Sequence, residues 1–245
     1  MSIMQEKPED VFQIVAEDCK KIFGSDLISI ILYGSGARAD YIPKRSDLNF
    51  MIVLTEQGLA SLDGVMGAVK HWQRYHVAIP LFITKCYLVD SLDSYPIEFL
   101  NIKRRYKIIY GEDILLGLSF DNHHIRLQIE RELRGKLLHL RSGWLETRDK
   151  AKNLRKLIAV SLTAFVSLFC ALLYMKQMEL PEGNIDVITA AGDALGFDAG
   201  VFLDCEKIHR GSDHFSSDEI KVIFRKYLKQ VEQLCNRIDR LRIDE

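Results

Sequence analysis

The sequence predicts an α+β fold, in which a small mixed β-sheet with helices is followed by an all-α helical bundle. Two observations lead to this prediction. Helix and strand patterns alternate in the first half of the chain, whereas the second half shows only the helical spacing of apolar residues. The pattern breaks between Gly117 and Asn122, so we expect one domain over 1–118 and a second over 119–245.

The first half contains the strands. Apolar residues at helical spacing predict a helix from Pro8 to Phe23, which Gly24 ends. Two β-rich runs, Leu27–Tyr33 and Asn49–Leu54, predict strands, and the second is apolar enough to be buried on both faces. The further elements expected here are a helix over 58–75, a strand over 79–84, a helix over 97–106 and a short strand over 107–110.

The second half predicts three or four main helices. An apolar face from Ile125 to Trp144 predicts the first, and an uncharged apolar segment and a shorter helix over 185–195 follow it. The last helix opens with Ser216 and Glu219, which have the spacing of a capping box. This pattern is typical of a helical bundle.

The uncharged segment, Leu157–Met175, is long enough to span a bilayer. Ser161, Thr163 and Ser167 lower its hydropathy, and the sequence has no second segment of this kind. We therefore interpret it as a buried core helix and expect no contact with a membrane, with a membrane span as the alternative.

The composition excludes several classes of protein. A formal net charge of −1 creates no global field that attracts nucleic acid or acidic membranes. The five cysteines form no C-x-x-C pair, so neither a zinc site nor a disulfide framework is expected. Free thiols, together with an amino terminus that lacks the pattern of a signal peptide, favour a cytoplasmic protein.

The segment that follows the first strand has the pattern of a phosphate-binding turn. Gly34 and Ser35 come directly after an apolar run. Glycine lets the backbone approach a ligand closely, and the free N–H groups of such a turn attract phosphate. Arg38 follows three residues later and suits a phosphate with its two-pronged guanidinium. These residues are candidates for nucleotide binding, and a simple tight turn is the alternative.

The start of the next strand carries polar residues. Asp47 precedes the apolar run, and Asn49 shares its face because side chains alternate along a strand. Together with the turn, this resembles the motif of the nucleotidyltransferase superfamily, of the DNA polymerase β-like fold and the kanamycin nucleotidyltransferase and MNT types. The residues that match the motif are Gly34, Ser35, Ala37, Arg38, Ser46 and Asp47.

The resemblance implies the fold and the activity. It implies a sheet domain with a helical C-terminal domain, which binds a nucleoside triphosphate and transfers its nucleoside monophosphate to a hydroxyl acceptor. It assigns nucleotide binding to Gly34, Ser35, Arg38 and Ser46.

The acidic residues depart from the family pattern. In the family, both carboxylates of Asp-x-Asp hold two Mg²⁺ ions, and a third carboxylate on a neighbouring strand activates the hydroxyl. Here Asn49 occupies the second position, and Ile79–Tyr87 contains no Asp or Glu. Asp47 and Asn49 are thus the candidate catalytic residues and metal ligands of a weakened Mg²⁺ site. We interpret Glu98 as a first-turn helix residue and not as a replacement.

The incomplete pattern leaves open whether the chain is an enzyme. The first hypothesis is an active nucleotidyltransferase. The second is a catalytically inactive nucleotide sensor or antitoxin-like module, which acts through a protein partner or as a homodimer. A third is a helical-domain ribonuclease that uses Arg134 and His139. Contact with a triphosphate or RNA backbone also stays open for five basic residues, with a solvated helix face as the alternative: Arg126, Arg131, Arg134, Lys136 and Arg141.

Overall fold

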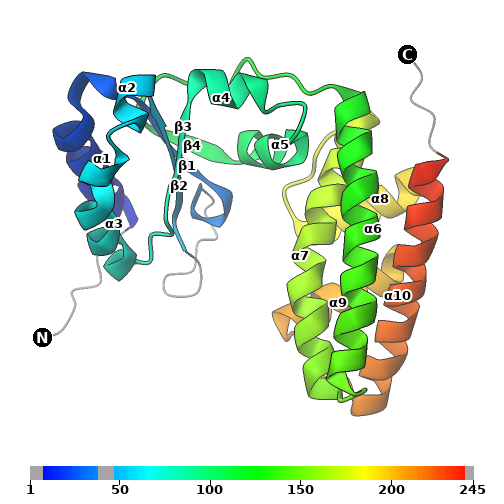
Figure 1. Ribbon diagram of the computed structural model, residues 1–245. Helices are drawn as coiled ribbons and strands as arrows, with labels where there is room; N and C mark the ends of the chain where they lie inside the picture. Colours follow the sequence, from blue (N-terminus) through cyan, green and yellow to red (C-terminus); the bar gives the residue numbers. More distant parts are fainter. Residues whose placement is uncertain (1–7, 38–46, 241–245) are drawn as a thin grey trace, which may run out of the picture. The chain divides into compact units, whose positions relative to one another are not determined.

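The computed structural model describes residues 8–37 and 47–240 of the 245-residue chain (Figure 1). The chain forms two compact units. The first unit comprises 1–92 and 98–119, and the second comprises 93–97 and 120–245. The division into domains over 1–118 and 119–245 stays a prediction.

The first unit is built on a four-stranded mixed sheet with the order β3-β2-β1-β4. β1 (Leu27–Tyr33) lies antiparallel between β2 (Asn49–Leu54) and β4 (Tyr106–Gly111). β3 (Leu81–Thr84) pairs in parallel with β2 at the sheet edge. It is shorter than the predicted strand because it begins directly after Pro80, which has no N–H to donate to a ladder.

The two faces of this sheet follow from the alternation of side chains along each strand. Leu32 and Phe50 are fully buried and pack in one core with residues of α1 (Pro8–Phe23). Ile31 and Met51, one position away on the same strands, are fully buried on the opposite face. Figure 1 shows α1 on one side of the sheet and α5 (Pro96–Arg104) on the other.

The helix predicted over 58–75 is wrong. The segment is divided among α2 (Glu56–Leu59), α3 (Met66–Trp72) and two short 3₁₀ turns. Gly58, Gly64 and Gly67 explain the division, because each glycine inside a helix costs about 1 kcal/mol relative to alanine. The short α4 (Lys85–Asp90) was not predicted either, and it begins where the Thr84 hydroxyl accepts a hydrogen bond from the Tyr87 N–H.

The second unit is helical, as predicted. α7 packs against each of the other four helices of the bundle. The capping box of Ser216 and Glu219 is present at the start of the last helix. The bundle helices are α6 (Asn122–Thr147), α7 (Ala151–Met175), α8 (Asn184–Leu195), α9 (Ala199–Arg210) and α10 (Ser217–Asp239).

The segment that is long enough to span a membrane lies in α7. Of the helices in the described ranges, α7 alone has the length and hydropathy of a membrane span, and 56% of its most apolar window is buried inside the protein. Ile158, Phe165 and Phe169 are fully buried among the other helices. This packing favours the core-helix interpretation of the segment.

Candidate functional site

The turn after β1 is held in a conformation that requires glycine. Gly34 has φ +74°, in the left-handed region that side-chain-bearing residues avoid, and it opens a 3₁₀ turn, Gly34–Ala37. Its N–H donates a hydrogen bond to the Arg105 carbonyl oxygen over 3.1 Å. The turn is therefore tied to the residue that precedes β4.

A second glycine lets the turn lie on the sheet core. A Cβ atom at Gly36 would come within 2.8 Å of the Leu48 Cδ2 atom and 3.4 Å of a Leu32 methyl. Both leucines are buried, so neither moves away easily. Ser35, between the two glycines, is exposed. The arrangement presents the Ser35 side chain to solvent above a tightly packed backbone.

The structure brings three of the predicted site residues together. Asn49 lies directly opposite Tyr33, the last residue of β1, and its Nδ2 atom is 3.6 Å from the point that a Gly34 Cβ would occupy. The same Nδ2 atom contacts the Asp47 carbonyl oxygen at 3.5 Å. Asp47 is exposed and Asn49 is half-buried. The predicted residues Arg38 and Ser46 lie outside the described residues.

The donors around Asn49 do not fit a resident pair of metal ions. Within 8–37 and 47–240 there is no group of three or more His, Cys, Asp or Glu side chains that could hold a metal. Asp47 supplies one carboxylate, and the Asn49 amide supplies at most a neutral oxygen. Two-metal phosphoryl transfer depends on several carboxylates that neutralise the ions, and the described residues around Asn49 do not supply them.

The neighbouring strand carries apolar side chains on the sheet face of Asn49. Leu81 of β3 pairs with Met51 of β2, so it lies on the same sheet face as Asn49. Phe82 points to the other face, where it contacts the Phe23 ring with centroids 6.3 Å apart. Glu98, the other acid considered from the sequence, lies in the first turn of α5, as interpreted.

Sequence reasoning missed the residues that continue the site along the sheet. Tyr33 pairs with Tyr106 of β4, so Asn49, Tyr33 and Tyr106 form a row across three strands on one face. Burial raises the pKa of the Tyr33 hydroxyl. Burial and the 2.8 Å hydrogen bond that Tyr106 donates to Asp113 raise the pKa of Tyr106 to about 12. Both phenols therefore stay protonated at neutral pH.

Arg105 was also missed, because its position beside Gly34 arises from strand pairing and not from sequence spacing. The register of β1 with β4 places Arg105 across from Gly34. The contact with the turn is made by the main-chain carbonyl of Arg105.

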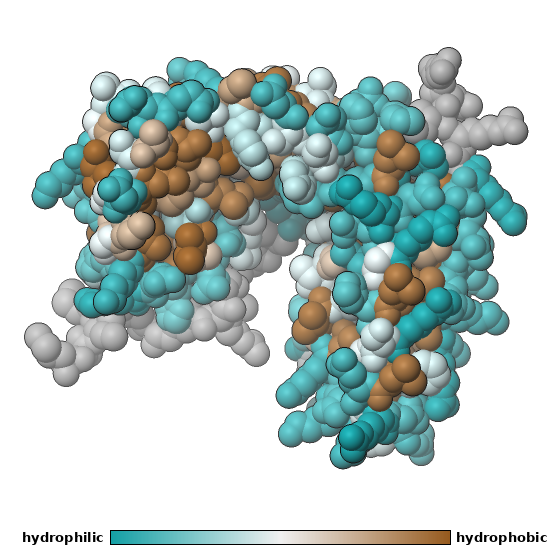
Figure 2. Space-filling model, in the orientation of Figure 1, coloured by the Kyte–Doolittle hydropathy of each residue, from teal (hydrophilic) through white to brown (hydrophobic). Residues whose placement is uncertain are grey.

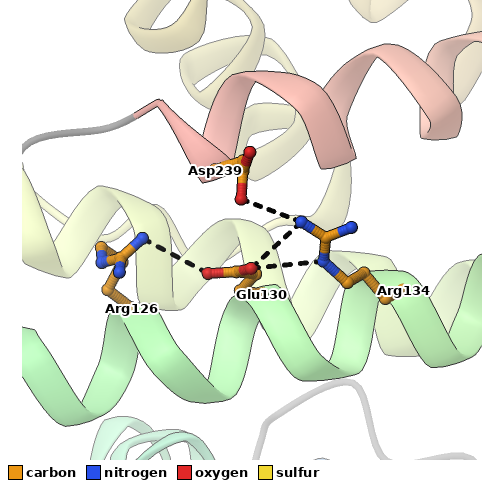
Figure 3. Close-up of polar contacts among 4 residues, drawn as sticks. All are labelled: Arg126, Glu130, Arg134 and Asp239. Atoms are coloured by element: carbon orange, nitrogen blue, oxygen red, sulfur yellow. Dashed lines mark hydrogen bonds and ion pairs between the residues drawn. The ribbon is translucent and has the colours of Figure 1, made fainter.

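The ribonuclease hypothesis gains no support from α6. Arg134 donates hydrogen bonds to Glu130 on its own helix and to Asp239 of α10, at 3.1 and 2.9 Å (Figure 3). His139, five residues later, lies about 140° away around an α-helix. The two side chains therefore do not share a face, and Arg134 has a structural role.

Most of the five basic residues singled out from the sequence pair within the bundle. Arg126 and Arg134 share Glu130, Lys136 pairs with Glu132, and Arg141 pairs with Glu232. These contacts favour the solvated helix face over a nucleic-acid surface.

Comparisons with known proteins bear on the fold. No protein-family model and no curated protein sequence matches the chain. Among solved structures, the chain is similar to spectinomycin adenyltransferase AAD(9) from Enterococcus faecialis, determined with ATP and spectinomycin. The TM-score is 0.54 at 14% identity, over 95% of this chain and 99% of the other. The chain has a nucleotidyltransferase fold.

This result confirms the predicted α+β fold class and the resemblance noted from the sequence. The position of the Gly34 turn in this fold agrees with the motif. The turn, Asp47 and Asn49 lie at one end of the mixed sheet, where the predicted motif locates the site.

Proposed function

We propose that the chain binds a nucleoside triphosphate, as its Mg²⁺ complex, at the Gly34–Ala37 turn and transfers the nucleoside monophosphate to an acceptor oxygen. The observation that carries the proposal is the meeting of this turn with Asp47 and Asn49. The fold is also similar to that of an adenyltransferase determined with ATP.

The residues divide the work of binding. The turn offers backbone N–H groups and the exposed Ser35 hydroxyl to the phosphates. Asp47 is exposed beside the turn and provides a negative charge for the Mg²⁺ that the nucleotide brings with it. The hydrogen bond from the Gly34 N–H to the Arg105 carbonyl oxygen holds the turn in the shape that presents these groups.

A catalytically inactive nucleotide sensor or protein-interaction module is the second candidate. One observation favours it: of the three carboxylates that the family motif leads us to expect, Asp47 is the one present in the sequence. Asn49 occupies the second position, and β3 carries the apolar Leu81 on the same sheet face. Under this proposal the turn still binds a nucleotide, whereas transfer does not occur.

Calorimetric titration of ATP and GTP, with and without Mg²⁺, separates the two candidates when it is combined with release of labelled pyrophosphate. The transferase predicts Mg²⁺-dependent binding and turnover, both weakened by Asp47→Ala and unaffected by Asp63→Ala, an exposed acid elsewhere in the same unit. Binding without turnover in the presence of varied acceptors supports the sensor. No nucleotide binding under any condition overturns both.

A further inference from the structure

A histidine lies beside the candidate site, on the segment that pairs with the residues before β2. Leu48 and Val77 form a parallel bridge. The Leu48 N–H donates a hydrogen bond to the His76 carbonyl oxygen over 2.8 Å, and the Ala78 N–H donates one to the Leu48 carbonyl oxygen over 3.0 Å. Asp47 and His76 each come one residue before this bridge, so the parallel register makes them neighbours. The backbone of His76 is thus next to the acidic residue of the site.

The side chains around this bridge divide between the core and the solvent. Leu48 and Val77 are buried in the core that contains residues of α1. Asp47 and His76 are both exposed. Within residues 8–37 and 47–240, neither of these two side chains makes a hydrogen bond or an ion pair. The imidazole of His76 is therefore available to a molecule bound at the site.

The backbone of His76 has a conformation that disfavours a side chain. His76 has φ 58° and ψ 32°, in the left-handed region, and its N–H donates a hydrogen bond to the Gln73 carbonyl oxygen over 3.2 Å. Glycine adopts this conformation freely, yet the sequence has a histidine here. Unfavourable backbone conformations of this kind cluster at functional sites. Because the exposed imidazole has no partner in the described fold, packing does not account for a histidine at this position.

We propose that His76 accepts the proton of the acceptor hydroxyl during nucleotidyl transfer, a role that the resemblance gives to a carboxylate on the neighbouring strand. The inference rests on the proposed function. A neutral hydroxyl must lose its proton as it attacks, and histidine is the side chain that most often takes such a proton, because imidazole gains and loses a proton near neutral pH.

The surface along β3 leaves this role to a residue outside the strand. β3 contains neither Asp nor Glu. Leu81 is 43% exposed, and Ile79, just before the strand, is 67% exposed. Figure 2 shows hydrophobic residues gathered over the sheet of the first unit. These apolar side chains take no proton, whereas His76 directly precedes them along the chain.

The position of His76 beside Asp47 suits the proposed role. An acceptor that attacks the α-phosphorus must lie next to the phosphates, which the proposed function locates at the Gly34–Ala37 turn and Asp47. Paired segments of a sheet lie about 4.8 Å apart. A hydroxyl placed beside Asp47 is therefore within reach of an imidazole on the adjacent segment.

The step balances in atoms and electrons. The hydroxyl oxygen forms a bond with the α-phosphorus, and its proton passes to the unprotonated ring nitrogen of His76. The bond between the α-phosphorus and the oxygen that bridges to the β-phosphorus breaks, and pyrophosphate leaves with that electron pair. The imidazolium then returns the proton to water. The product is a phosphodiester between the nucleoside monophosphate and the acceptor.

The backbone conformation allows variants that remove the imidazole without disturbing the fold. Glycine and asparagine both adopt the left-handed region readily, so His76→Gly and His76→Asn should fold like the natural chain. Calorimetry should show unchanged binding of ATP with Mg²⁺. Release of labelled pyrophosphate from ATP, with glycerol as the hydroxyl probe, should fall by about 10²–10⁴-fold, which is the usual contribution of a positioned base.

Free imidazole gives a readout that a purely structural role would not change. It should restore part of the lost rate in His76→Gly, whose missing side chain leaves a position open to solvent, and should leave the rate of the natural chain unaltered. His214→Asn is the matched control, because it removes an exposed histidine from the helical unit. This variant should transfer at the natural rate.

A folded His76→Gly or His76→Asn variant that transfers at the natural rate overturns the inference. A loss of rate that free imidazole does not restore indicates a structural role for His76 and overturns it as well. If ATP binds but the natural chain releases no pyrophosphate with glycerol or other alcohols, the inference fails while nucleotide binding stands. If ATP does not bind, the proposed function fails, and the inference fails with it.

Discussion

The N–H of Gly34 donates a hydrogen bond to the carbonyl oxygen of Arg105, which joins the end of β1 to the beginning of β4 at the candidate phosphate-binding turn. At the same residue the backbone turns with a positive φ of +74°. The turn is thus held from both sides, by this bond and by the packing of Gly36 on Leu48.

Gly34→Ala should lower both stability and nucleotide affinity. A side chain at φ +74° costs about 1–2 kcal/mol, and the added Cβ would contact the Asn49 amide. Gly24→Ala is the matched control, since Gly24 has φ +53°, meets no neighbouring atoms and lies before the other end of β1. Denaturant unfolding should show similar losses in both variants, whereas calorimetry should show weaker ATP binding in Gly34→Ala alone. Equal ATP affinity in the two variants would count against the turn as the nucleotide site.

Asn49→Asp should strengthen the dependence of ATP binding on Mg²⁺. The change adds a negative charge beside Asp47 on the same sheet face, and we expect a gain in Mg²⁺-dependent affinity of about tenfold. Titration of ATP at several Mg²⁺ concentrations measures this gain. Asn153→Asp, an exposed change in α7, should leave the affinity unaltered. If both variants bind ATP like the natural chain, Asp47 and Asn49 do not meet the metal of the nucleotide.

Glu206→Gln should destabilise the helical unit. Glu206 is 2% exposed, and its Oε1 atom accepts hydrogen bonds from Arg210 Nε at 2.8 Å and Asn184 Nδ2 at 3.3 Å. Loss of this charged acceptor should lower the free energy of unfolding by about 1–3 kcal/mol. Asp204→Asn removes an exposed partner of Lys207 and should cost less than about 0.5 kcal/mol. Chemical denaturation of both variants gives the comparison, and equal losses would contradict the assigned role.

Glu219→Gln should remove a pH-dependent part of the stability. The Glu219 carboxylate accepts a 2.7 Å hydrogen bond from the Ser216 N–H, which lowers its pKa below the ordinary value of 4.5. A lowered pKa in the folded state stabilises the protein above the ordinary value, and this contribution is lost as the pH falls through the folded-state value. The natural chain should therefore exceed the variant in stability at pH 7 and approach it in acid. Thermal unfolding at a series of pH values tests this, and a difference that grows in acid would refute it.

The sequence predicted the elements whose local patterns agree with their packing. β1 and β2 have the predicted bounds, because both are continuous apolar runs that end at turn residues. The capping box located the start of α10 for the same local reason. α9 was missed, although Asp198 caps it and Val201, Cys205 and Ile208 form its buried face. Its twelve residues lie between Gly196 and Gly211, and no element was predicted there.

The sequence predicted the site residues that lie close together along the chain. It did not predict the residues that strand pairing brings to the site. Gly34, Asp47 and Asn49 were identified from their spacing, and β1 pairs with β2 so that Gly34 and Asn49 meet. Arg105 and Tyr106 join them from a strand about seventy residues further along, and no local pattern identifies them. The register of β4 is set by tertiary packing, which a single sequence does not show.

The division of the chain between the two compact units has a consequence for dissecting the protein. Residues 93–97 group with the helices, and the N–H of Ile97 is bound by the buried Gln128 side chain of α6 at 3.0 Å. No single cut of the polypeptide therefore releases either unit whole. A fragment that stops at Ser119 keeps the sheet but leaves the first turn of α5 without its Gln128 acceptor.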